Sequence, residues 1–317
     1  MIEHLPRTII SAATEFPAAI RAHPLRAVTA NELLEMNIPP REHLLSPILV
    51  TQSLSMLYAK RGVGKTHFAL GLAYAIASGG RYLRYCAPAA RKVLYIDGEM
   101  PASAMQTRLA EIAAVSATEP PDPSYLKFLT PDLQPGAMPD ISTAEGQAAI
   151  EQFLDGVTLV VVDNLSTLAR TGKENESEGW FPVQGWALSL RRRGMSVLFV
   201  HHAGKGGAQR GTSKREDVLD TIVRLQHSDD YSPEEGARFE VHIDKGRHLF
   251  GMDARPFEAR LSDGTWTVRD LDDVDMARVV ELTRDGLSAR EIADETGISK
   301  SRVNRMQKRA REAGRIE

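Results

Sequence analysis

The sequence predicts an α/β protein whose mostly parallel central sheet is followed by a small all-α module. Between residues 54 and 200, short apolar segments of strand length alternate with longer segments of helical period. That alternation is typical of a parallel sheet covered by helices on both faces. The last forty residues instead show three helical patterns separated by tight breaks, and the net charge changes sign there. We therefore expect two parts with different architecture.

The composition is that of a folded chain. It has 317 residues, 39 Lys and Arg against 42 Asp and Glu, and a formal charge of −3. With 42% hydrophobic and 26% charged residues, it is neither disordered nor membrane-like. The N-terminal residues lack a signal-peptide core, and no run approaches the ~20 apolar residues of a membrane helix. The single cysteine, Cys86, excludes an intramolecular disulfide. We expect a soluble, cytoplasmic protein with no membrane partner.

The elements of the larger part can be assigned in order. Residues 1–45 form an N-terminal arm with one or two short helices, and the sheet domain spans residues 46–272. The expected strands are residues 54–58, 92–96, 126–129, 159–162, 196–200, 221–226, 238–243 and 266–269. The expected helices are residues 66–78, 102–115, 143–153 and 180–193. The last three strands look like a meander.

The smaller part, residues 276–317, is entirely helical in pattern. Its expected helices are residues 276–286, 288–296 and 299–313. It carries ten basic and seven acidic residues, a charge of +3, so the remainder of the chain carries −6. The acidic stretch 270–275 is the expected boundary. An acidic main domain is therefore joined to a small basic module.

A phosphate-binding loop lies between the first expected strand and helix. Residues 59–66, AKRGVGKT, match the P-loop pattern GxxxxGK[ST] except that Ala59 replaces the first glycine. Glycines allow backbone N–H groups to wrap a phosphate, and the following helix points its positive end at the anion. Lys65 can reach the β- and γ-phosphates, and the Thr66 hydroxyl can ligate Mg²⁺. The expected ATP-binding residues are Ala59, Lys60, Arg61, Gly62, Val63, Gly64, Lys65, Thr66 and His67.

Two carboxylates at strand ends are expected to complete this phosphate site. Asp163 ends an apolar strand and can hold Mg²⁺, although a helix cap or turn aspartate is the alternative. Glu99 follows strand 92–96 and can orient and deprotonate the attacking water. Asp97 competes with Glu99 for this role, and an ordinary turn carboxylate is the alternative to both. The sequence thus predicts a site that hydrolyses ATP with Mg²⁺.

The motifs AKRGVGKTH, VLYIDGEMP, LVVVDNLSTL and VLFVHHAGKGGAQRGTS follow one another along the chain. In this series the sequence resembles the RecA-type P-loop ATPases (AAA family ATPases) of the RepA-like hexameric replicative helicase group. The resemblance covers roughly residues 38–251. It implies a RecA-like fold, a homo-hexameric ring and ATP bound between subunits. It also implies that Lys65 and Thr66 are the P-loop pair, Glu99 the catalytic base and Asp163 the Walker B acid.

Further roles follow from the same resemblance. His202, with His201 as the alternative, falls where the family has a γ-phosphate sensor; otherwise both are polar strand-end residues or, weakly, metal ligands. Arg210 falls where the family carries an arginine finger that reaches a neighbour's nucleotide. Lys245 and Arg247 form a Lys-x-Arg pattern and are the second candidate. Solvated loop charges are the alternative for these three cations. If these cations reach a neighbour's nucleotide, ATP hydrolysis depends on assembly of the subunits.

The C-terminal module has the features of a helix-turn-helix. Ser288 and Glu291 form a capping box, Gly297 makes the sharp turn, and Ser299 is expected to cap the second helix. In the run AREIADETGISKSRVNRMQKRAR it resembles the DNA-binding domains of bacterial regulators. The expected DNA-binding residues are Lys300, Ser301, Asn304, Arg305 and Lys308. A helical module that docks a partner protein is the alternative.

Together these features predict an ATP-hydrolysing ring protein that acts on DNA. A replicative helicase or DNA-dependent ATPase of a plasmid, phage or mobile element is the first hypothesis. The second is a regulatory DNA-binding ATPase whose nucleotide state controls assembly on duplex DNA without unwinding. A third, weaker hypothesis is a ring that acts on protein partners. All three share the ATP site, so the sequence identifies the ATPase better than its task.

Overall fold

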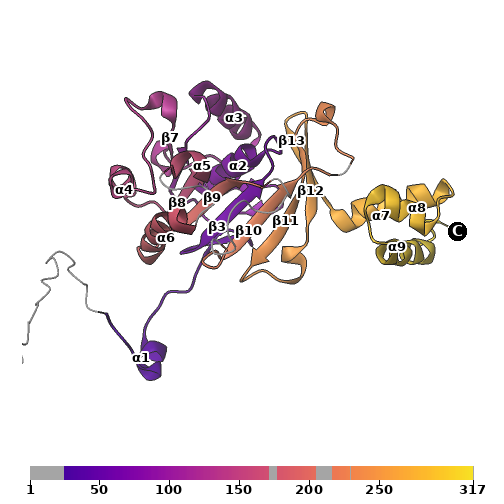
Figure 1. Ribbon diagram of the computed structural model, residues 1–317, viewed down its shortest axis with the longest axis horizontal. Coiled ribbons are helices and arrows are strands. Elements are labelled where there is room, and N and C mark those ends of the chain that lie inside the picture. The colour runs from indigo at the N-terminus through magenta and orange to yellow at the C-terminus, as the bar shows by residue number, and fades with distance from the viewer. Residues whose placement is uncertain (1–24, 171–176, 205–215, 229, 317) are drawn as a thin grey trace, which may run out of the picture. The chain divides into compact units, whose positions relative to one another are not determined.

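A nine-stranded sheet forms the centre of the computed structural model, which describes residues 25–170, 177–204, 216–228 and 230–316 (Figure 1). The strand order is β13-β12-β11-β10-β3-β9-β8-β6-β7. The strands are β3 (Leu54–Ala59), β6 (Val93–Asp97), β7 (Leu126–Leu129), β8 (Leu159–Asp163), β9 (Ser196–His202), β10 (Thr221–Gln226), β11 (Arg238–Gly246), β12 (Phe257–Ser262) and β13 (Thr265–Asp270). Neighbours from β7 to β10 pair in parallel, and β10 to β13 pair antiparallel. The predicted α/β class is confirmed.

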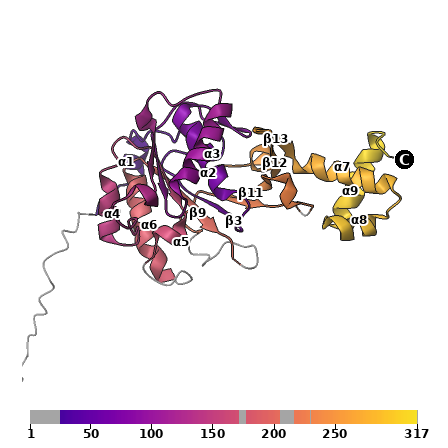
Figure 2. The ribbon, with the colours of Figure 1, turned by 90° about the horizontal axis from the view of Figure 1, so that it is seen from above.

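Helices cover both faces of this sheet (Figures 1 and 2). They are α2 (Lys65–Ser78), α3 (Ala102–Val115), α4 (Ala144–Glu151), α5 (Leu165–Leu168) and α6 (Ser177–Arg192). Along β3, Leu57 and Ala59 belong to the core under α2, while Leu54, Met56 and Tyr58 belong to the core under α6. Successive side chains of a strand point to opposite faces, so a strand buried on both faces has an unbroken apolar sequence. This explains the apolar runs from which the strands were predicted.

Several elements were not predicted from the sequence. The short strands are β1 (His43–Leu45), β2 (Leu49–Val50), β4 (Arg81–Tyr82) and β5 (Tyr85–Cys86), and the 3-10 helices are η1 (Pro123–Tyr125), η2 (Pro131–Leu133), η4 (Pro233–Glu235) and η5 (Gly251–Ala254). Elements of two to four residues are too short to show a period. The missing strand of the meander is β12, although Phe257, Ala259 and Leu261 alternate with polar residues as a half-buried strand requires. That signal could have been found.

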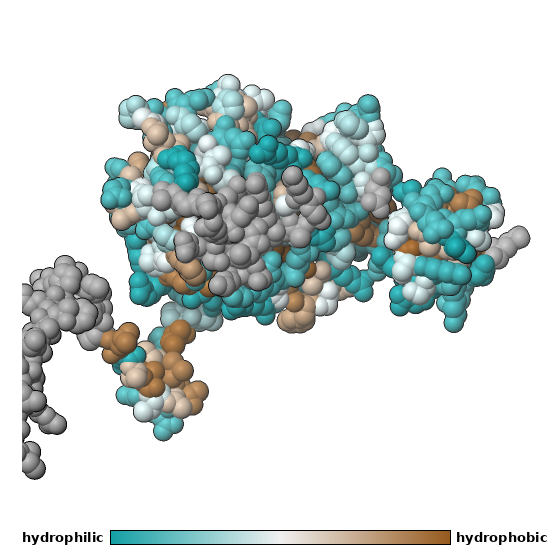
Figure 3. Space-filling view, in the orientation of Figure 1, coloured by the Kyte–Doolittle hydropathy of each residue, from teal (hydrophilic) through white to brown (hydrophobic). Residues whose placement is uncertain are grey.

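The chain divides into two compact units, Met1–Pro40 and Arg41–Glu317. In the first, α1 (Ala30–Glu35) is a short helix with a capping box between Thr29 and Glu32. Its apolar side chains Leu33 and Leu34 are 52% and 83% exposed, and Figure 3 shows apolar surface on this part of the chain. One short helix of the predicted arm is therefore present in the described part of residues 1–45.

The C-terminal helices α7 (Leu271–Arg284), α8 (Ala289–Thr296) and α9 (Lys300–Glu312) pack around a core of their own. Val279, Ile292 and Val303, one from each helix, are fully buried there. The predicted all-α module is thus confirmed. However, α7 begins within the acidic stretch that was expected to be a boundary. Asp272 and Asp273 occupy its first turn, where carboxylates are stabilised by the positive end of the helix dipole.

Candidate functional site

The phosphate-binding loop connects β3 to α2. Gly62 and Gly64 have φ values of 84° and 110°, a left-handed conformation in which a residue with a side chain would be strained. Gly64 is the N-cap of α2 and contributes no side-chain cap, so the first N–H groups of the helix face the loop. Lys65 Nζ donates hydrogen bonds to the carbonyl oxygens of Ala59 and Lys60 at 3.1 and 2.9 Å. The loop therefore presents N–H groups and one ammonium to an anion.

A cavity of about 430 Å³ opens beside this loop. It is lined by Arg61, Gly62, Gly64, Lys65, Thr66, Asp97, Glu99, Met100, Pro101, Arg108, Asp163, Asn164 and His202. Ala59 pairs with His202 between β3 and β9, and Asp97 pairs with Asp163 between β6 and β8. Because parallel strands end at the same edge of a sheet, four strands place their C-terminal residues here. Predicted site residues as far apart in sequence as Arg61 and His202 are thereby brought together.

Asp163 is buried at the end of β8, with 3% of its surface exposed. Tyr95 Oη donates a hydrogen bond to Asp163 Oδ2 at 2.7 Å. Burial raises the pKa of Asp163, while hydrogen bonds from Tyr95 and Thr66 and the charge of Lys65 act against it. Burial likewise lowers the pKa of Lys65, and Asp163 opposes this. A bound cation would compensate this buried carboxylate, and the adjacent Thr66 hydroxyl and Asp163 carboxylate are the oxygen donors that Mg²⁺ prefers.

Glu99 and Asp97 are the two candidates for the base, and the structure gives them different environments. Asp97 is 2% exposed and accepts a hydrogen bond from the N–H of Met100 at 2.9 Å. Burial raises the pKa of Asp97 to about 7. Glu99 is exposed on the cavity wall, and the side-chain amide of Asn164 donates a hydrogen bond to its carboxylate. Asp97 therefore stabilises the turn after β6, and Glu99 is accessible to water.

Not every predicted nucleotide-binding residue lines the cavity. Ala59 and Val63 are buried in the core, and Lys60 contributes its carbonyl to Lys65. His67 points along α2 to the indole of Trp266, with ring centroids 5.6 Å apart and planes tilted by 54°. Burial, followed by the charge of Arg108, lowers the pKa of His67. The His67 ring and the half-buried indole form an aromatic corner between α2 and β13.

The structure separates the two histidines at the end of β9. His201 is fully buried, whereas His202 is partly exposed and lines the cavity. This follows from the alternation of side chains along a strand. Among the residues predicted for the γ-phosphate sensor, His202 is thus the one in contact with the cavity.

The predicted finger residues Lys245 and Arg247 do not line this cavity. Arg210 lies outside the described residues. Lys245 donates a hydrogen bond to the backbone carbonyl of Glu216, and Arg247 Nη2 donates one to that of Asp217 at 2.6 Å. Both cations therefore contact the main chain of the same molecule.

Arg108 and Asn164 line the cavity and were missed in the sequence. Asn164 caps α5 by accepting a hydrogen bond from the N–H of Thr167 at 3.2 Å. Arg108 lies on α3 between the buried Met105 and Ile112. The sequence did contain a signal for Arg108, because it stands at helical spacing within an apolar stripe. A cation on the buried face of a helix requires an anionic partner, which indicates a binding site. Nothing in the local sequence of Asn164 distinguished it from an ordinary cap.

The C-terminal module has helix-turn-helix geometry. The predicted capping box is present, with Ser288 N–H 2.8 Å from Glu291 Oε2, and Gly297 adopts a φ of 69° in the turn. Ser299 occupies the N-cap position of α9, but its hydroxyl lies 3.3 Å from that of Ser301 and makes no capping hydrogen bond. Ser299 therefore has the predicted N-cap position, but the predicted capping hydrogen bond is not formed. All five predicted DNA-binding residues are exposed on α9: Lys300, Ser301, Asn304, Arg305 and Lys308.

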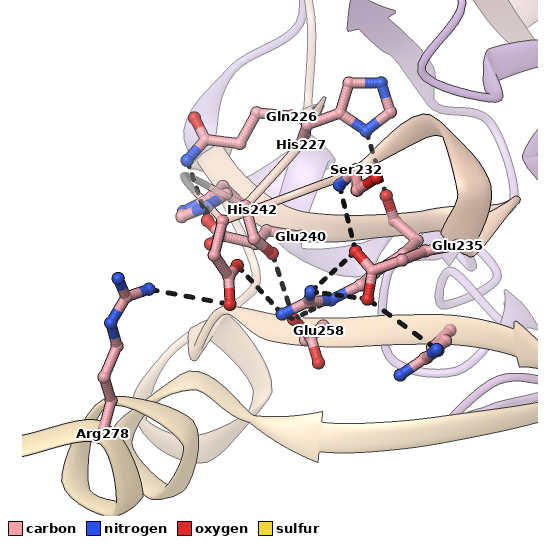
Figure 4. A network of polar contacts seen from close by, with 12 residues as sticks. Gln226, His227, Ser232, Glu235, Glu240, His242, Glu258 and Arg278 are labelled. Carbon is pink, nitrogen blue, oxygen red and sulfur yellow. Dashed lines mark hydrogen bonds and ion pairs between the residues drawn. The ribbon is translucent and has the colours of Figure 1, made fainter. Parts of the chain in front are cut away.

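Charged contacts join the β10–β11 hairpin to α7 (Figure 4). Arg238 forms ion pairs with Asp230, Glu235 and Glu258 at 3.1, 3.0 and 2.8 Å. Arg278 of α7 lies 3.6 Å from Asp230. Since the Arg238 side chain is only 10% exposed, these carboxylates compensate a largely buried charge. The hairpin thus provides an attachment for the first helix of the C-terminal module.

Comparison with protein families gives two matches. A model described as an AAA domain matches residues 20–208, and one described as a homeodomain-like domain matches residues 275–317. Within the described residues, no helix is both long and apolar enough to cross a membrane.

Individual proteins give weaker similarities. The DNA repair protein RadA of Mycobacterium tuberculosis is 23% identical over 211 residues, which is 65% of this chain. The chain spans only 38% of the length of RadA. The crystal structure of a KaiC-like protein from the archaeon Pyrococcus horikoshii OT3 superposes with a TM-score of 0.50 at 14% identity, over 71% of this chain and 93% of that one. This likeness concerns the fold.

Proposed function

The chain belongs to the AAA domain family, whose model covers residues 20–208, and on that premise we propose that it is an ATP-hydrolysing, RecA-like ring protein that acts on DNA. The cavity carries this proposal. It joins the P-loop residues Lys65 and Thr66 to Glu99 and Asp163 at one edge of the sheet. Phosphoryl transfer requires this set of groups, because catalysis there consists of positioning and charge stabilisation.

Binding of the triphosphate is assigned to the loop and the start of α2. N–H groups around Gly62 and Gly64 would surround the β-phosphate, and Lys65 would exchange its two carbonyl partners for phosphate oxygens. Thr66 and Asp163 would hold Mg²⁺, which supplies neutralising charge to the phosphates. Burial of Asp163 and its hydrogen bond from Tyr95 keep that carboxylate in a fixed position.

Glu99 is the proposed base for the attacking water. It is exposed to the cavity, and the hydrogen bond from Asn164 restrains the orientation of its carboxylate. A base must lie within hydrogen-bond reach of the proton it accepts, and a carboxylate on the cavity wall meets that condition. His202 is proposed to contact the γ-phosphate, and Arg108 adds positive charge to the lining of the cavity.

The adenine base is proposed to lie against the aromatic corner of His67 and Trp266. The His67 ring follows Thr66 directly on α2 and contacts Trp266, which supports placing the base beside these two rings. Stacking on aromatic side chains is a general way to hold a base.

Assembly into a homo-hexamer is proposed from the positions of the candidate fingers. Lys245 and Arg247 contact carbonyl oxygens rather than their own cavity, so a transferring phosphoryl group that they stabilise would belong to a neighbour. Arg210 remains the first candidate of the sequence analysis. Hydrolysis would then require contact between protomers.

The proposal that the protein acts on DNA rests on the C-terminal module. Its exposed basic helix α9 and its homeodomain-like match support contact with duplex DNA. A RepA-like replicative helicase is the first proposal, since ring ATPases of that kind use ATP to move along DNA. A regulatory ATPase that assembles on duplex DNA without unwinding is the second, and the duplex-reading geometry of α9 favours it.

Two measurements test these proposals. The variant Lys65→Ala is expected to lower ATP turnover at least ~100-fold, since it removes the ammonium that contacts the phosphates. Lys127→Ala on the exposed edge of β7 is the control and should leave turnover unchanged. Equal turnover in both variants would contradict the ATP site.

Displacement of a labelled strand, with ATPase stimulation by single-stranded DNA, would support the helicase. Hydrolysis that ignores single strands, together with binding of a specific duplex, would support the regulatory ATPase.

A further inference from the structure

Strand β11 contains one residue too many for its pairing with β10. Ile222 pairs with Lys245, whereas the next residue, Val223, pairs with Ile243. Asp244 is therefore the extra residue of a β-bulge. A bulge reverses the alternation of side chains beyond it and changes the direction of the strand, and such features are frequent beside active sites. The residues that follow this bulge are Lys245 and Arg247.

The side chain of Asp244 is bound on two sides. The hydroxyl of Tyr58 donates a hydrogen bond to Asp244 Oδ2, and Arg224 Nε lies 3.0 Å from the same oxygen. Tyr58 and Arg224 are neighbours in the pairing of β3 with β10. Tyr58 is only 5% exposed, and burial together with Asp244 raises its pKa, so it remains a hydrogen-bond donor at all ordinary pH. One carboxylate thus connects the bulge to its neighbouring strand β10 and to β3, the strand beyond it.

Tyr58 also belongs to the strand that carries the P-loop. The next residue, Ala59, accepts the hydrogen bond from Lys65 Nζ at 3.1 Å. The contact between Tyr58 and Asp244 therefore connects the strand of a protomer's own ATP site to the start of its Lys-x-Arg segment. These contacts cross from β3 past β10 to β11 within three neighbouring strands.

Beyond the bulge, Lys245 and Arg247 are held by neutral groups. Their partners are the carbonyl oxygens of Glu216 and Asp217, and within the described residues neither cation forms an ion pair with a carboxylate. Their charges are consequently available to an external anion. A cation can leave a neutral carbonyl oxygen and bind a phosphate oxygen at much lower cost than it can leave a carboxylate. No ion pair has to be broken in the first case.

We propose that Asp244 is a positioning residue, which fixes the bulge so that the side chains of Lys245 and Arg247 are directed toward a neighbouring protomer's triphosphate. This inference rests on the proposed function, in which these two cations act between subunits. Asp244 touches neither substrate nor cavity. It acts through the backbone of residues 244–247, and its loss leaves the P-loop intact while misdirecting the cations.

The test compares steady-state ATP hydrolysis of full-length variants at a concentration where the wild-type protein is assembled. Asp244→Ala is expected to lower kcat about 10- to 100-fold, because a misplacement near 1 Å costs roughly that much. The KM for ATP and the affinity for a fluorescent ADP analogue should stay within about twofold, since the P-loop contacts remain. Asp253→Ala, an exposed aspartate in η5, is the matched control and should retain wild-type kcat.

A double variant, Lys245→Ala with Arg247→Ala, separates the inference from its premise. It should lower kcat at least as much as Asp244→Ala, and Asp244→Ala should have no further effect in that background. If the double variant retains kcat, the proposed fingers are wrong and the inference falls with them. If only Asp244→Ala retains kcat, the inference alone is overturned. An equal fall in both backgrounds also overturns it, because that result indicates a general structural role.

Loss of folding in Asp244→Ala, detected by circular dichroism, does not remove the test. Tyr58→Phe deletes one hydroxyl from the core and keeps the carboxylate, and Asp244→Asn keeps the size of the side chain. Each is expected to lower kcat several-fold in the wild-type background and not in the double variant. Full activity of both would overturn the proposal.

Discussion

Replacement of Asp97 by asparagine is expected to change how the stability of the protein depends on pH. Asp97 is 2% exposed at the end of β6. Its burial is the main cause that raises its pKa from 3.8 to about 7; the Met100 N–H opposes the rise and Asp163 adds to it. The folded state therefore binds this proton more tightly than the unfolded state does. Asparagine has nearly the same shape and can still accept the hydrogen bond from Met100.

The direction and size of the effect follow from this difference. Since the unfolded chain ionises first, stability falls as the pH rises from about 4 to about 7 and stays reduced above that. Each tenfold change in proton affinity is worth ~1.4 kcal/mol, so the full penalty is about 4 kcal/mol, of which about 3 kcal/mol develops between about pH 5 and about pH 8.5. Asparagine cannot ionise. The stability of Asp97→Asn relative to wild type should therefore increase by about 3 kcal/mol across that range.

Urea denaturation at about pH 5 and about pH 8.5, without nucleotide or Mg²⁺, measures the free energy of unfolding of both proteins directly. Titrating groups that do not interact with Asp97 are common to both proteins and cancel in the comparison, while its interaction with Asp163 is part of the measured difference. Asp155→Asn, at an exposed turn position, is the control for the same exchange outside the site. If the difference between Asp97→Asn and wild type varied by less than ~0.5 kcal/mol, the burial argument would be refuted.

Two further predictions concern ligands. Arg305→Ala should weaken binding of a specific duplex about 5- to 150-fold, because an exposed arginine on the second helix contributes ~1–3 kcal/mol. Arg269→Ala on β13 should bind normally in the same gel-shift titration. Trp266 is half-buried, while Trp180 and Trp186 are 2% and 6% exposed. ATP should therefore change the tryptophan fluorescence, and Trp266→Phe should abolish the change while Trp186→Phe keeps it. An undiminished signal in Trp266→Phe, or an equal response to inorganic tripolyphosphate, would contradict the assigned position of the base.

The sequence alone determined the fold class and the phosphate-binding loop. Both depend on local order: strands buried on two faces need unbroken apolar runs, and a P-loop is one contiguous segment of eight residues. The capping box of Ser288 is local for the same reason, and the structure confirms it. The alternation of apolar and polar residues in β12 is equally local, so this strand was also predictable from the sequence.

The tertiary structure decided what depends on residues distant in the chain. Whether Glu99 or Asp97 meets water, and which histidine of β9 faces the cavity, follows from burial, which the local sequence does not specify. Arg108 enters the site because α3 packs beside the strand ends. The bulge at Asp244 arises from pairing with β10, since an extra residue is defined only relative to a partner strand. Local patterns thus fix the elements, and contacts between elements fix the geometry of the site.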